Sequence, residues 1–148
     1  MKREEAWKLY TDGAWRPKLN RGSWGAFMVS ASGIAYTTYG GQENTTSNRM
    51  EMMGVIQGYH FLKTKHADAC YIRIYTDSQY IYLAVTQYLA KWMQDQSWQT
   101  RARKPVKNRD LWQEIIVILQ GCDTISWRWI NREKNIKAHL VAEQGLNL

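Results

Sequence analysis

The sequence predicts an α/β fold in which a mixed sheet of five strands is flanked by helices. Three observations support this expectation: three strand-like segments follow one another near the N-terminus, two more alternate with amphipathic helical segments, and the chain has 148 residues. A chain of this length is most simply one domain, residues 1–148, with a single hydrophobic core. No repeat, low-complexity tract or linker-like stretch interrupts the sequence, so we expect no second domain.

Three strands are expected at the start of the chain. Residues 7–14, 23–30 and 33–40 contain the aromatic and β-branched residues that favour strands. Turn-forming residues lie between them: Gly22, Ser23, Ser32 and Gly33. Short turns between consecutive strands predict an antiparallel meander.

A helix is expected next, over residues 45–63. Five apolar residues of this segment recur at helical spacing and share one face: Met52, Val55, Ile56, Tyr59 and Leu62. One of three hydroxyl-bearing residues would cap its first turn: Thr45, Thr46 or Ser47.

The remaining segments alternate between strand and helix patterns. A strand over 69–76 precedes a helical segment over 78–93, which we expect to be interrupted near Thr86. After a loop that contains Pro105, the last expected elements are a helix over 107–120, a strand over 123–130 and a helix over 135–146. This order predicts a mixed sheet with helices packed on it.

Charge and composition narrow the range of functions. The formal net charge is +7 and the isoelectric point about 9.5, which favours a polyanionic partner, although a solvated basic surface would give the same count. No apolar run approaches the length of a membrane span, and the charged N-terminal residues are unlike a secretory signal. We therefore expect a cytoplasmic, monomeric protein without membrane contact. Cys70 and Cys122 lack metal-ligand spacing and are expected to be reduced core residues.

Two aspartates end strand-like segments. Asp12 closes the run "KLYTD", and Asp77 closes "IRIYTD". Ligands gather at the carboxyl ends of sheet strands, so the two carboxylates would converge if their strands are neighbours. Glu51, in the opening turns of the intervening helix, could point at the same place.

Each of these acids also has a plainer interpretation. Asp12 and Asp77 could form turns at strand ends, and Glu51 could be solvated or cap its helix. A carboxylate that leaves water is costly unless something compensates it, and one cation could compensate all three. Hard cations such as Mg²⁺ and Mn²⁺ prefer oxygen ligands, so the common position of the acids favours a divalent-metal site.

Six segments occur together in a characteristic order: "YTDG", "TTSNRMEMM", "YTDSQYI", "TQYLAKW", "KPVKNRDLWQ" and "WRWI". Together they resemble the type 1 ribonuclease H family, especially its compact bacterial members. The resemblance implies a ribonuclease H-like fold. It also implies an endonuclease that cuts the RNA strand of an RNA–DNA hybrid and leaves 3′-hydroxyl and 5′-phosphate ends.

The resemblance further implies how metals are held. Two ions, Mg²⁺ or Mn²⁺, placed roughly 4 Å apart can ionise the attacking water and stabilise the leaving 3′-oxygen. On this expectation Asp12 bridges both ions, while Glu51 and Asp77 each complete one side.

By the same resemblance, several polar residues would contact the hybrid. Ser47, Asn48 and Gln79 match minor-groove contacts, through which the shape and 2′-hydroxyls of a hybrid are recognised. Thr46 and Asn108 match positions that hold a phosphate of the DNA strand. A helix cap for Ser47 or Thr46, and a strand-end hydrogen bond for Gln79, are alternatives that can coexist with these roles.

A basic segment over 87–109 resembles the family's protrusion, which grips the DNA strand. Its expected nucleic-acid contacts are Lys91, Trp92, Arg101, Arg103, Lys104 and Lys107. Cationic side chains release counterions from phosphates. The indoles of Trp92 and Trp98 could stack on a sugar or pack the base of the protrusion. A solvated charged face is the alternative, but the interleaved tryptophans favour nucleic acid.

The C-terminal part departs from the family pattern. Family members continue after the Trp-x-Trp strand with a glycine-rich loop that bears a histidine, and then a helix that supplies a fourth acidic ligand. Here the loop is short and lacks the histidine, and His139 stands at the position of the acid. The turn after Asp12, "AWRPKLNRGS", is altered as well.

Three interpretations of His139 stay open. Its imidazole could ligate one ion, which would favour Mn²⁺ over Mg²⁺. It could instead shuttle a proton from a position beside the ligands. It could also be inert, with Glu143 one turn later as an acidic replacement. We expect His139 to lie near the metals, with Mn²⁺ preferred.

The sequence therefore predicts a metal-dependent endoribonuclease that acts on RNA–DNA hybrids. Its expected catalytic and metal-binding residues are Asp12, Glu51, Asp77 and His139. The alternative is a hybrid-binding protein whose cutting power was weakened with the loss of the fourth carboxylate. An exonuclease of this fold is disfavoured, because such enzymes pair two acids in the first strand motif and Ala14 stands two residues after Asp12.

Overall fold

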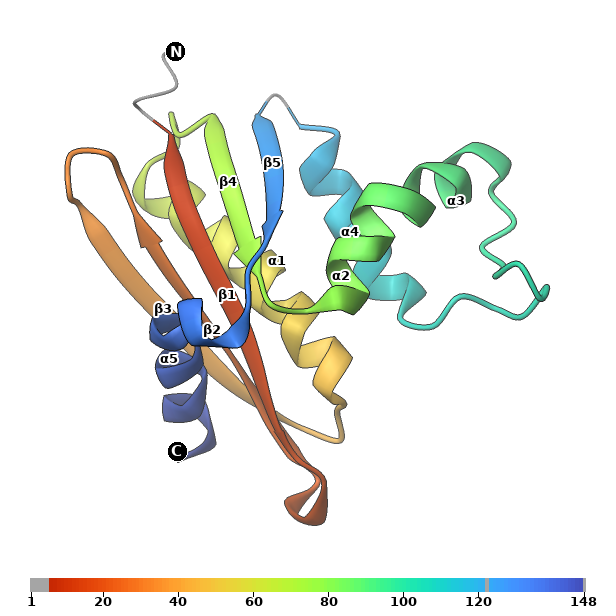
Figure 1. Ribbon diagram of the computed structural model, residues 1–148, viewed down its shortest axis with the longest axis horizontal. Coiled ribbons are helices and arrows are strands. Elements are labelled where there is room, and N and C mark those ends of the chain that lie inside the picture. The colour runs from red at the N-terminus through yellow and green to blue at the C-terminus, as the bar shows by residue number, and fades with distance from the viewer. Residues whose placement is uncertain (1–5, 122, 148) are drawn as a thin grey trace.

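Figure 1 shows the computed structural model, which describes residues 6–121 and 123–147. Five strands form one sheet: β1 (Trp7–Arg16), β2 (Arg21–Val29), β3 (Ala35–Glu43), β4 (Tyr71–Thr76) and β5 (Thr124–Trp129). Their order across the sheet is β3-β2-β1-β4-β5. The strand that follows the first meander in sequence, β4, therefore lies directly beside β1.

The sheet contains both kinds of strand pairing. β1 pairs with β2, and β2 with β3, in antiparallel fashion, whereas β1 with β4 and β4 with β5 are parallel. The expected mixed sheet and its antiparallel meander are confirmed, as is the turn at Ser32 and Gly33, where Gly33 has a φ of 95°. Parallel neighbours need a crossover connection. The helix α1 (Ser47–Lys65) supplies it between β3 and β4.

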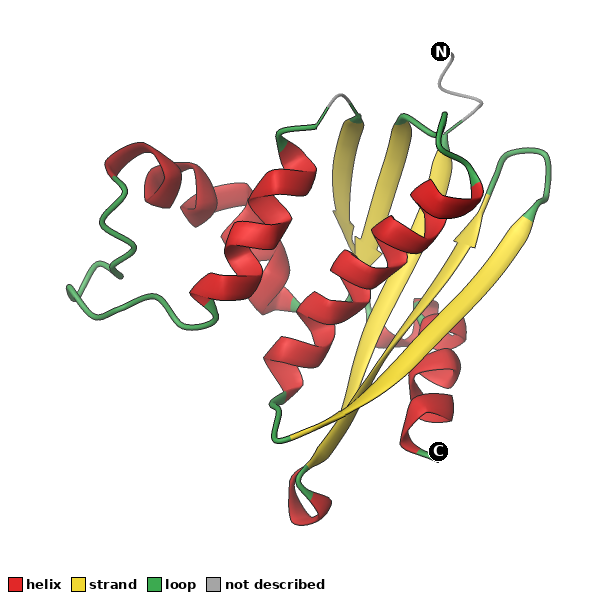
Figure 2. Cartoon of the chain, turned by 180° about the vertical axis from the view of Figure 1, so that it is seen from behind, coloured by secondary structure: helices red, strands yellow, loops and turns green. Residues whose placement is uncertain are grey.

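Helices cover both faces of the sheet, as Figure 2 shows from behind. α1 packs across β1 and β2 on one face, with α4 (Arg109–Leu119) beside it. α5 (Ile136–Leu146) packs across β1, β2 and β3 on the other face. Among the described residues, no helix is both long and apolar enough to cross a membrane.

The helical segment after β4 changes to π-helical geometry near Thr86, where a break was expected. α2 (Gln79–Leu83) continues into a π-helical turn, Ala84–Tyr88, and then into α3 (Leu89–Asp95). The Thr86 hydroxyl donates to the carbonyl of Tyr82 at 2.6 Å. Such a side-chain bond competes with the backbone ladder. The helix widens here and does not break.

The hydrophobic core lies between the sheet and α1. The apolar residues expected to share one helical face are all buried: Met52, Val55, Ile56, Tyr59 and Leu62. They face the inward residues of the central strands, of which Leu9 and Ile74 are fully buried. At the start of α1, the Thr46 hydroxyl accepts the N–H of Arg49 at 3.2 Å and caps the helix.

One predicted turn is wrong. Gly22 and Ser23 lie inside β2, and the chain reverses instead through a short 3-10 helix, Pro17–Leu19, and Asn20. Asn20 has a φ of 49°, a left-handed conformation that asparagine adopts more readily than most residues. Gly22 serves close packing, because a Cβ there would lie 2.7 Å from the side chain of Met50.

The two cysteines were expected in the core. Cys70 lies directly before β4 and is half-buried, so it is not a fully buried core residue. Cys122 lies outside the described residues.

Two glycines let α5 approach the sheet closely. A Cβ at Gly25 would lie 2.3 Å from the backbone nitrogen of Ala142. A Cβ at Gly145 would lie 2.7 Å from the Cβ of Ser23. The Ser23 hydroxyl also donates to the carbonyl of Ala142. These contacts determine the position of α5, and so of the side chains that it directs towards β1.

We expect Gly25→Ala to destabilise the protein by about 3 kcal/mol, because the added methyl group must displace the backbone of α5. Gly33→Ala is the matched control. A Cβ there would meet no atom within 4 Å, and the φ of 95° is the feature that opposes it, at a cost of about 1 kcal/mol. Urea denaturation measures both variants. Equal losses would contradict a tight contact between β2 and α5.

Candidate active site

Three carboxylates from distant parts of the chain meet beside the carboxyl end of β4, next to the central strand β1. Asp12 lies on β1, Asp77 directly follows β4, and Glu51 lies in α1. One oxygen from each falls within 4.8 Å of the other two. The structure thus brings together the three acids that the sequence analysis singled out.

Strand register and a glycine explain this meeting. Tyr10 and Tyr75 are partners in the parallel pair of β1 and β4. The two aspartates each follow two residues later and therefore lie side by side. Asp77 directly follows β4, whereas Asp12 lies within β1, paired with Gly25, and does not end its strand as the sequence pattern suggested. A Cβ at Gly13 would lie 2.6 Å from the backbone nitrogen of Glu51. The missing side chain of Gly13 therefore lets α1 cross β1 close enough to bring its carboxylate to the aspartates.

The carboxylates are poorly solvated and repel one another. Asp12 is only 4% exposed. Its burial raises the pKa of its carboxyl above the ordinary value, and the charge of Asp77 adds to the rise. Burial also raises the pKa of Glu51 well above its ordinary value, and the charge of Asp12 adds to this rise. Such a cluster is unfavourable unless protons or a cation neutralise it.

The cluster also has an unused acceptor. Oε2 of Glu51 is buried and accepts no hydrogen bond from any described residue. Buried acceptors are nearly always paired with protein, water or an ion. The available ligand atoms are all carboxylate oxygens, held within β1, directly after β4 and in α1. This set fits hard divalent cations such as Mg²⁺ and Mn²⁺.

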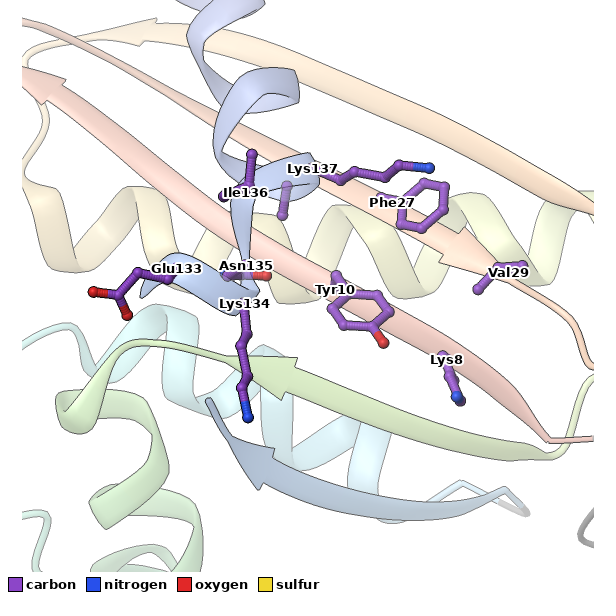
Figure 3. A pocket seen from close by; sticks show the side chains of 10 residues that line it. Lys8, Tyr10, Phe27, Val29, Glu133, Lys134, Asn135, Ile136 and Lys137 are labelled. Atoms are coloured by element: carbon purple, nitrogen blue, oxygen red, sulfur yellow. The ribbon is translucent and has the colours of Figure 1, made fainter. Parts of the chain in front are cut away.

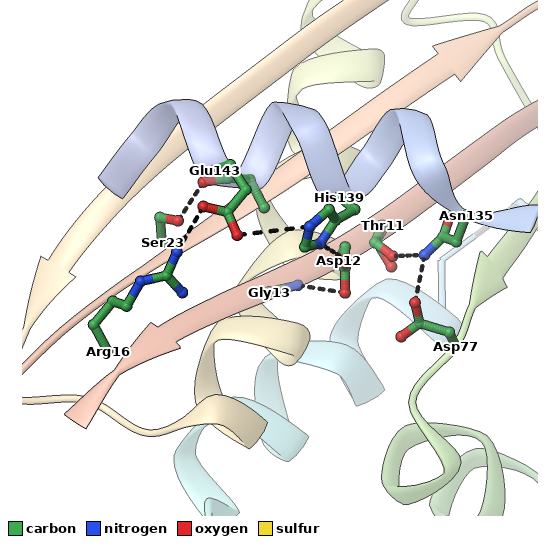
Figure 4. Close-up of polar contacts among 10 residues, drawn as sticks. Thr11, Asp12, Gly13, Arg16, Ser23, Asp77, Asn135, His139 and Glu143 are labelled. Carbon is green, nitrogen blue, oxygen red and sulfur yellow. Dashed lines mark hydrogen bonds and ion pairs between the residues drawn. The ribbon is translucent and has the colours of Figure 1, made fainter. Parts of the chain in front are cut away.

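Neighbouring groups fix the orientation of Asp77 (Figure 4). The buried amide of Asn135 donates to Asp77 Oδ2 at 3.2 Å and to the carbonyl of Thr11 at 2.9 Å. The indole of Trp129 donates to the backbone carbonyl of Asp77 at 3.2 Å. Neither role was predicted from the sequence. The only signal for Asn135 was an asparagine at the expected start of the last helix, which also fits a cap.

His139 lies beside Asp12 and connects it to a second charged pair (Figure 4). Its Nδ1 is 3.3 Å from Asp12 Oδ2, and its Nε2 is 3.6 Å from Oε1 of Glu143. Arg16 donates to the other carboxylate oxygen of Glu143 at 3.0 Å. The ring is therefore held between two carboxylates. Glu143 contacts His139 and Arg16 and is not part of the three-acid cluster.

The segment before α5 is short. Asn131 caps a 3-10 helix, Arg132–Lys134, by accepting the N–H of Lys134 at 3.2 Å. α5 then begins at Ile136. Because this connection contains no histidine, His139 is the residue that brings an imidazole to the acids.

The expected groove contacts lie at helix starts next to the acids. Ser47 and Asn48 are the first two residues of α1, one turn before Glu51. Gln79 is the first residue of α2, two residues after Asp77. Asn48 and Gln79 are exposed and Ser47 is half-buried.

Arg49 contacts both Thr46 and Asn108. Its backbone N–H donates to the Thr46 hydroxyl, and its guanidinium donates to Asn108 Oδ1 at 3.3 Å. Asp110 accepts two further bonds from the same guanidinium, at 3.0 and 2.7 Å. The Asn108 amide also donates to the hydroxyl of Tyr80 at 3.1 Å. The sequence analysis missed Arg49 and Tyr80, since their roles depend on contacts between α1, α2 and α4.

The basic segment projects as a lobe formed by α3 and the loop before α4 (Figure 1). Its basic side chains are exposed: Lys91, Arg101, Arg103, Lys104 and Lys107. Trp92 is half-buried, with its ring centroid 5.9 Å from that of Trp98 and 6.1 Å from that of Trp112. Of its two possible roles, packing at the base of the lobe is the one observed, and contact with nucleic acid stays a prediction.

In the absence of divalent cations, we expect Glu51→Gln to stabilise the protein by about 1 kcal/mol at pH 8, because an amide removes the repulsion with Asp12. Thermal unfolding in a chelator measures the change. Added Mg²⁺ or Mn²⁺ should reverse the order, since cation binding stabilises the folded wild type. Glu114→Gln, at an exposed position of α4, is the control and should leave Tm unchanged. A lower Tm for Glu51→Gln in chelator would contradict the repulsion.

Comparisons with known proteins agree with this geometry. The RNase H family model matches residues 4–146. The chain is 39% identical over 142 residues to ribonuclease H of Cupriavidus necator, with 93% of each chain covered. It is 34% identical over 144 residues to ribonuclease H of Pseudomonas fluorescens, which covers 95% of this chain and 91% of that one.

Solved structures share the fold. LC11-RNase H1, solved in complex with an RNA/DNA hybrid, has a TM-score of 0.76 at 16% identity and covers 95% of this chain and 96% of that one. RNase H1 of the archaeon Halobacterium salinarum has a TM-score of 0.73 at 22% identity, with 96% and 98% covered. The expected ribonuclease H-like fold is thus confirmed. The chain belongs to the RNase H family of enzymes.

Proposed function

We propose that this protein hydrolyses the RNA strand of RNA–DNA hybrids as an endonuclease. The observation that carries the proposal is the meeting of three carboxylates within 4.8 Å. One of them has a buried oxygen with no hydrogen-bond partner among the described residues. Relatives named ribonuclease H, and a structural neighbour bound to an RNA/DNA hybrid, support this choice of substrate. The net charge of +7 suits a polyanion.

Asp12, Glu51 and Asp77 would hold the two divalent cations, Mg²⁺ or Mn²⁺, that the proposal requires. When bound, the ions would supply ionisation of a water and stabilisation of the leaving 3′-oxygen, which yields 3′-hydroxyl and 5′-phosphate ends. The protein's own contribution is to hold the acids in place. Asn135 holds Asp77, and the Gly13 N–H donates to Asp12 Oδ1 at 2.9 Å.

The hybrid would lie across the starts of α1 and α2 and reach the basic lobe. The groove contacts proposed are Ser47, Asn48 and Gln79. Thr46 and Asn108, which both contact Arg49, would hold one phosphate of the DNA strand. The exposed cations of the lobe add salt-dependent affinity for the DNA strand.

We propose that His139 takes part in the site and is not an inert helix residue. Its contact with Asp12 at 3.3 Å puts the imidazole at the edge of the acid cluster, and Glu143 holds the far side of the ring. A nitrogen donor at this position would favour Mn²⁺ over Mg²⁺. We therefore propose Mn²⁺ as the preferred ion.

The proposed domain organisation, oligomeric state and location of the protein are based on the sequence alone. Length and the lack of linkers support one catalytic domain, residues 1–148, that works as a monomer. We propose a cytoplasmic location, which the expected reduced state of the cysteines supports.

An RNA–DNA duplex labelled on the RNA strand should be cut in Mg²⁺ or Mn²⁺, and Asp77→Asn should reduce kcat by more than about a hundredfold. The amide keeps the hydrogen bond capacity of the side chain but loses the charge that faces the cations. Asp68→Asn is the matched control, since Asp68 is exposed between α1 and β4, at the opposite end of that strand. Gel analysis of the labelled strand measures cutting and maps the product ends.

The same assay separates the two candidate functions. Tight binding of the hybrid with no cutting in either metal would support the alternative, a hybrid-binding protein that has lost catalysis. Cutting of a DNA–DNA duplex at a similar rate would contradict selection of the hybrid.

We expect His139→Asp to change the metal preference towards Mg²⁺ by about tenfold in the ratio of kcat/KM values, because oxygen replaces nitrogen beside Asp12. His139→Ala should lose the preference for Mn²⁺ without a gain in Mg²⁺. Metal titration by calorimetry gives a readout that does not depend on turnover. An unchanged metal preference in both variants would show that His139 does not ligate.

A further inference from the structure

Part of the sheet face that carries α5 has no helix over it (Figure 1). A cavity of about 330 Å³ opens there, beside the start of α5 (Figure 3). Its floor is formed by Lys8, Tyr10, Phe27 and Val29 of β1 and β2, and one wall by residues 133–138. With the exception of Asn135, none of these residues belongs to the site described above.

Aromatic side chains form a row across this face. Strand register places Phe27, Tyr10 and Tyr75 side by side on β2, β1 and β4. The ring centroids of Tyr10 and Tyr75 are 4.4 Å apart with 10° between the planes, and those of Tyr10 and Phe27 are 6.0 Å apart. All three residues keep part of their surface exposed. The tyrosine rings stack on each other and the Lys137 ammonium lies over Phe27, so an unpaired base can stack only on the ring faces that these contacts leave uncovered.

Basic side chains surround the row. Lys8 and Arg73 are register partners two residues before the tyrosines, and Nε of Arg73 is buried without a hydrogen-bond partner among the described residues. Lys134 and Lys137 come from the wall, and the Lys137 ammonium lies 4.7 Å from the ring centroid of the phenylalanine. Glu133 is the only acid among the ten residues that line the cavity. The surface therefore combines positive charge with flat apolar rings.

We propose that this face binds single-stranded nucleic acid, with bases stacked on Phe27, Tyr10 and Tyr75 and phosphates held by Lys8 and its basic neighbours. Bases in a duplex are stacked on each other and cannot use the rings, so the face selects unpaired strands. An acidic peptide would satisfy the lysines but has no flat groups that require an aromatic row. The proposal concerns binding and does not depend on hybrid cleavage.

The face is continuous with the acid cluster. Asn135 lines the cavity and also donates to Asp77. Tyr10 precedes Asp12 by two residues, so both lie on the same side of β1. An unpaired end of a hybrid could thus leave the acids, pass Asn135 and lie on the aromatic row.

The test is the affinity for a single strand of about ten nucleotides, measured by fluorescence anisotropy in a chelator so that no cleavage occurs. Lys8→Gln should weaken binding about fivefold and lower the salt slope by about one. Tyr10→Leu should weaken it about tenfold. Glu133→Gln should tighten it. Lys65→Gln is the matched control, because Lys65 is exposed on α1, over the opposite face, and its variant should bind like wild type.

A strand of the same length without bases separates stacking from charge. It should bind about tenfold more weakly to wild type and respond to Lys8→Gln but not to Tyr10→Leu. Equal affinity for the two strands, or equal losses in Lys8→Gln and Lys65→Gln, would overturn the proposal. Tighter binding of a polyglutamate peptide than of the single strand would also overturn the proposal, because it would assign this face to an acidic protein partner. The Lys8→Gln variant should cut a blunt-ended hybrid at the wild-type rate. A loss of single-strand binding can then be told apart from a loss of the proposed hybrid cleavage.

Discussion

The parallel pairing of β1 with β4 is the constraint on which the whole site depends. It sets the carboxyl end of β4 beside the middle of β1, so Asp12 and Asp77 meet although they are far apart in the chain. Parallel neighbours need a crossover, and α1 must then return over β1. Gly13 leaves the gap through which Glu51 joins the aspartates. The topology thus concentrates negative charge where solvent is scarce, and a bound cation is the simplest way to make that arrangement stable.

The position of α5 determines which side chains contact the acids. Because the connection after β5 is short, Asn135 serves both as the entrance to the helix and as a support for Asp77. One turn later His139 faces Asp12, with Glu143 and Arg16 behind it. Arg16 is half exposed, and such ion pairs contribute no more than about 1 kcal/mol. The value of this chain of contacts is therefore the orientation of the imidazole, and its stabilising effect is small.

The sequence predicted those features whose signals are local. Asp12 and Asp77 were identified because they end strand patterns, and the carboxyl ends of parallel strands are where ligands gather. The turn at Gly22 and Ser23 was wrong because glycine serves both turns and close packing, and only the packing of β2 against α1 decides between them. Asn135 was missed for a related reason. Its role depends on contacts with Thr11 and Asp77, which no pattern near residue 135 could reveal.

The acid cluster and the basic lobe lie in different parts of this fold. The acids lie within β1, directly after β4 and near the start of α1, where backbone pairing fixes their positions, as a reaction that depends on geometry requires. The cations of the lobe extend into solvent, while Trp92, Trp98 and Trp112 form a packed base beneath them. Counterion release depends on the number of charges near the phosphates more than on their exact arrangement. If the lobe binds nucleic acid as proposed, its exposed loop can therefore vary in conformation without moving the acids, because β1, β4 and α1 fix their positions.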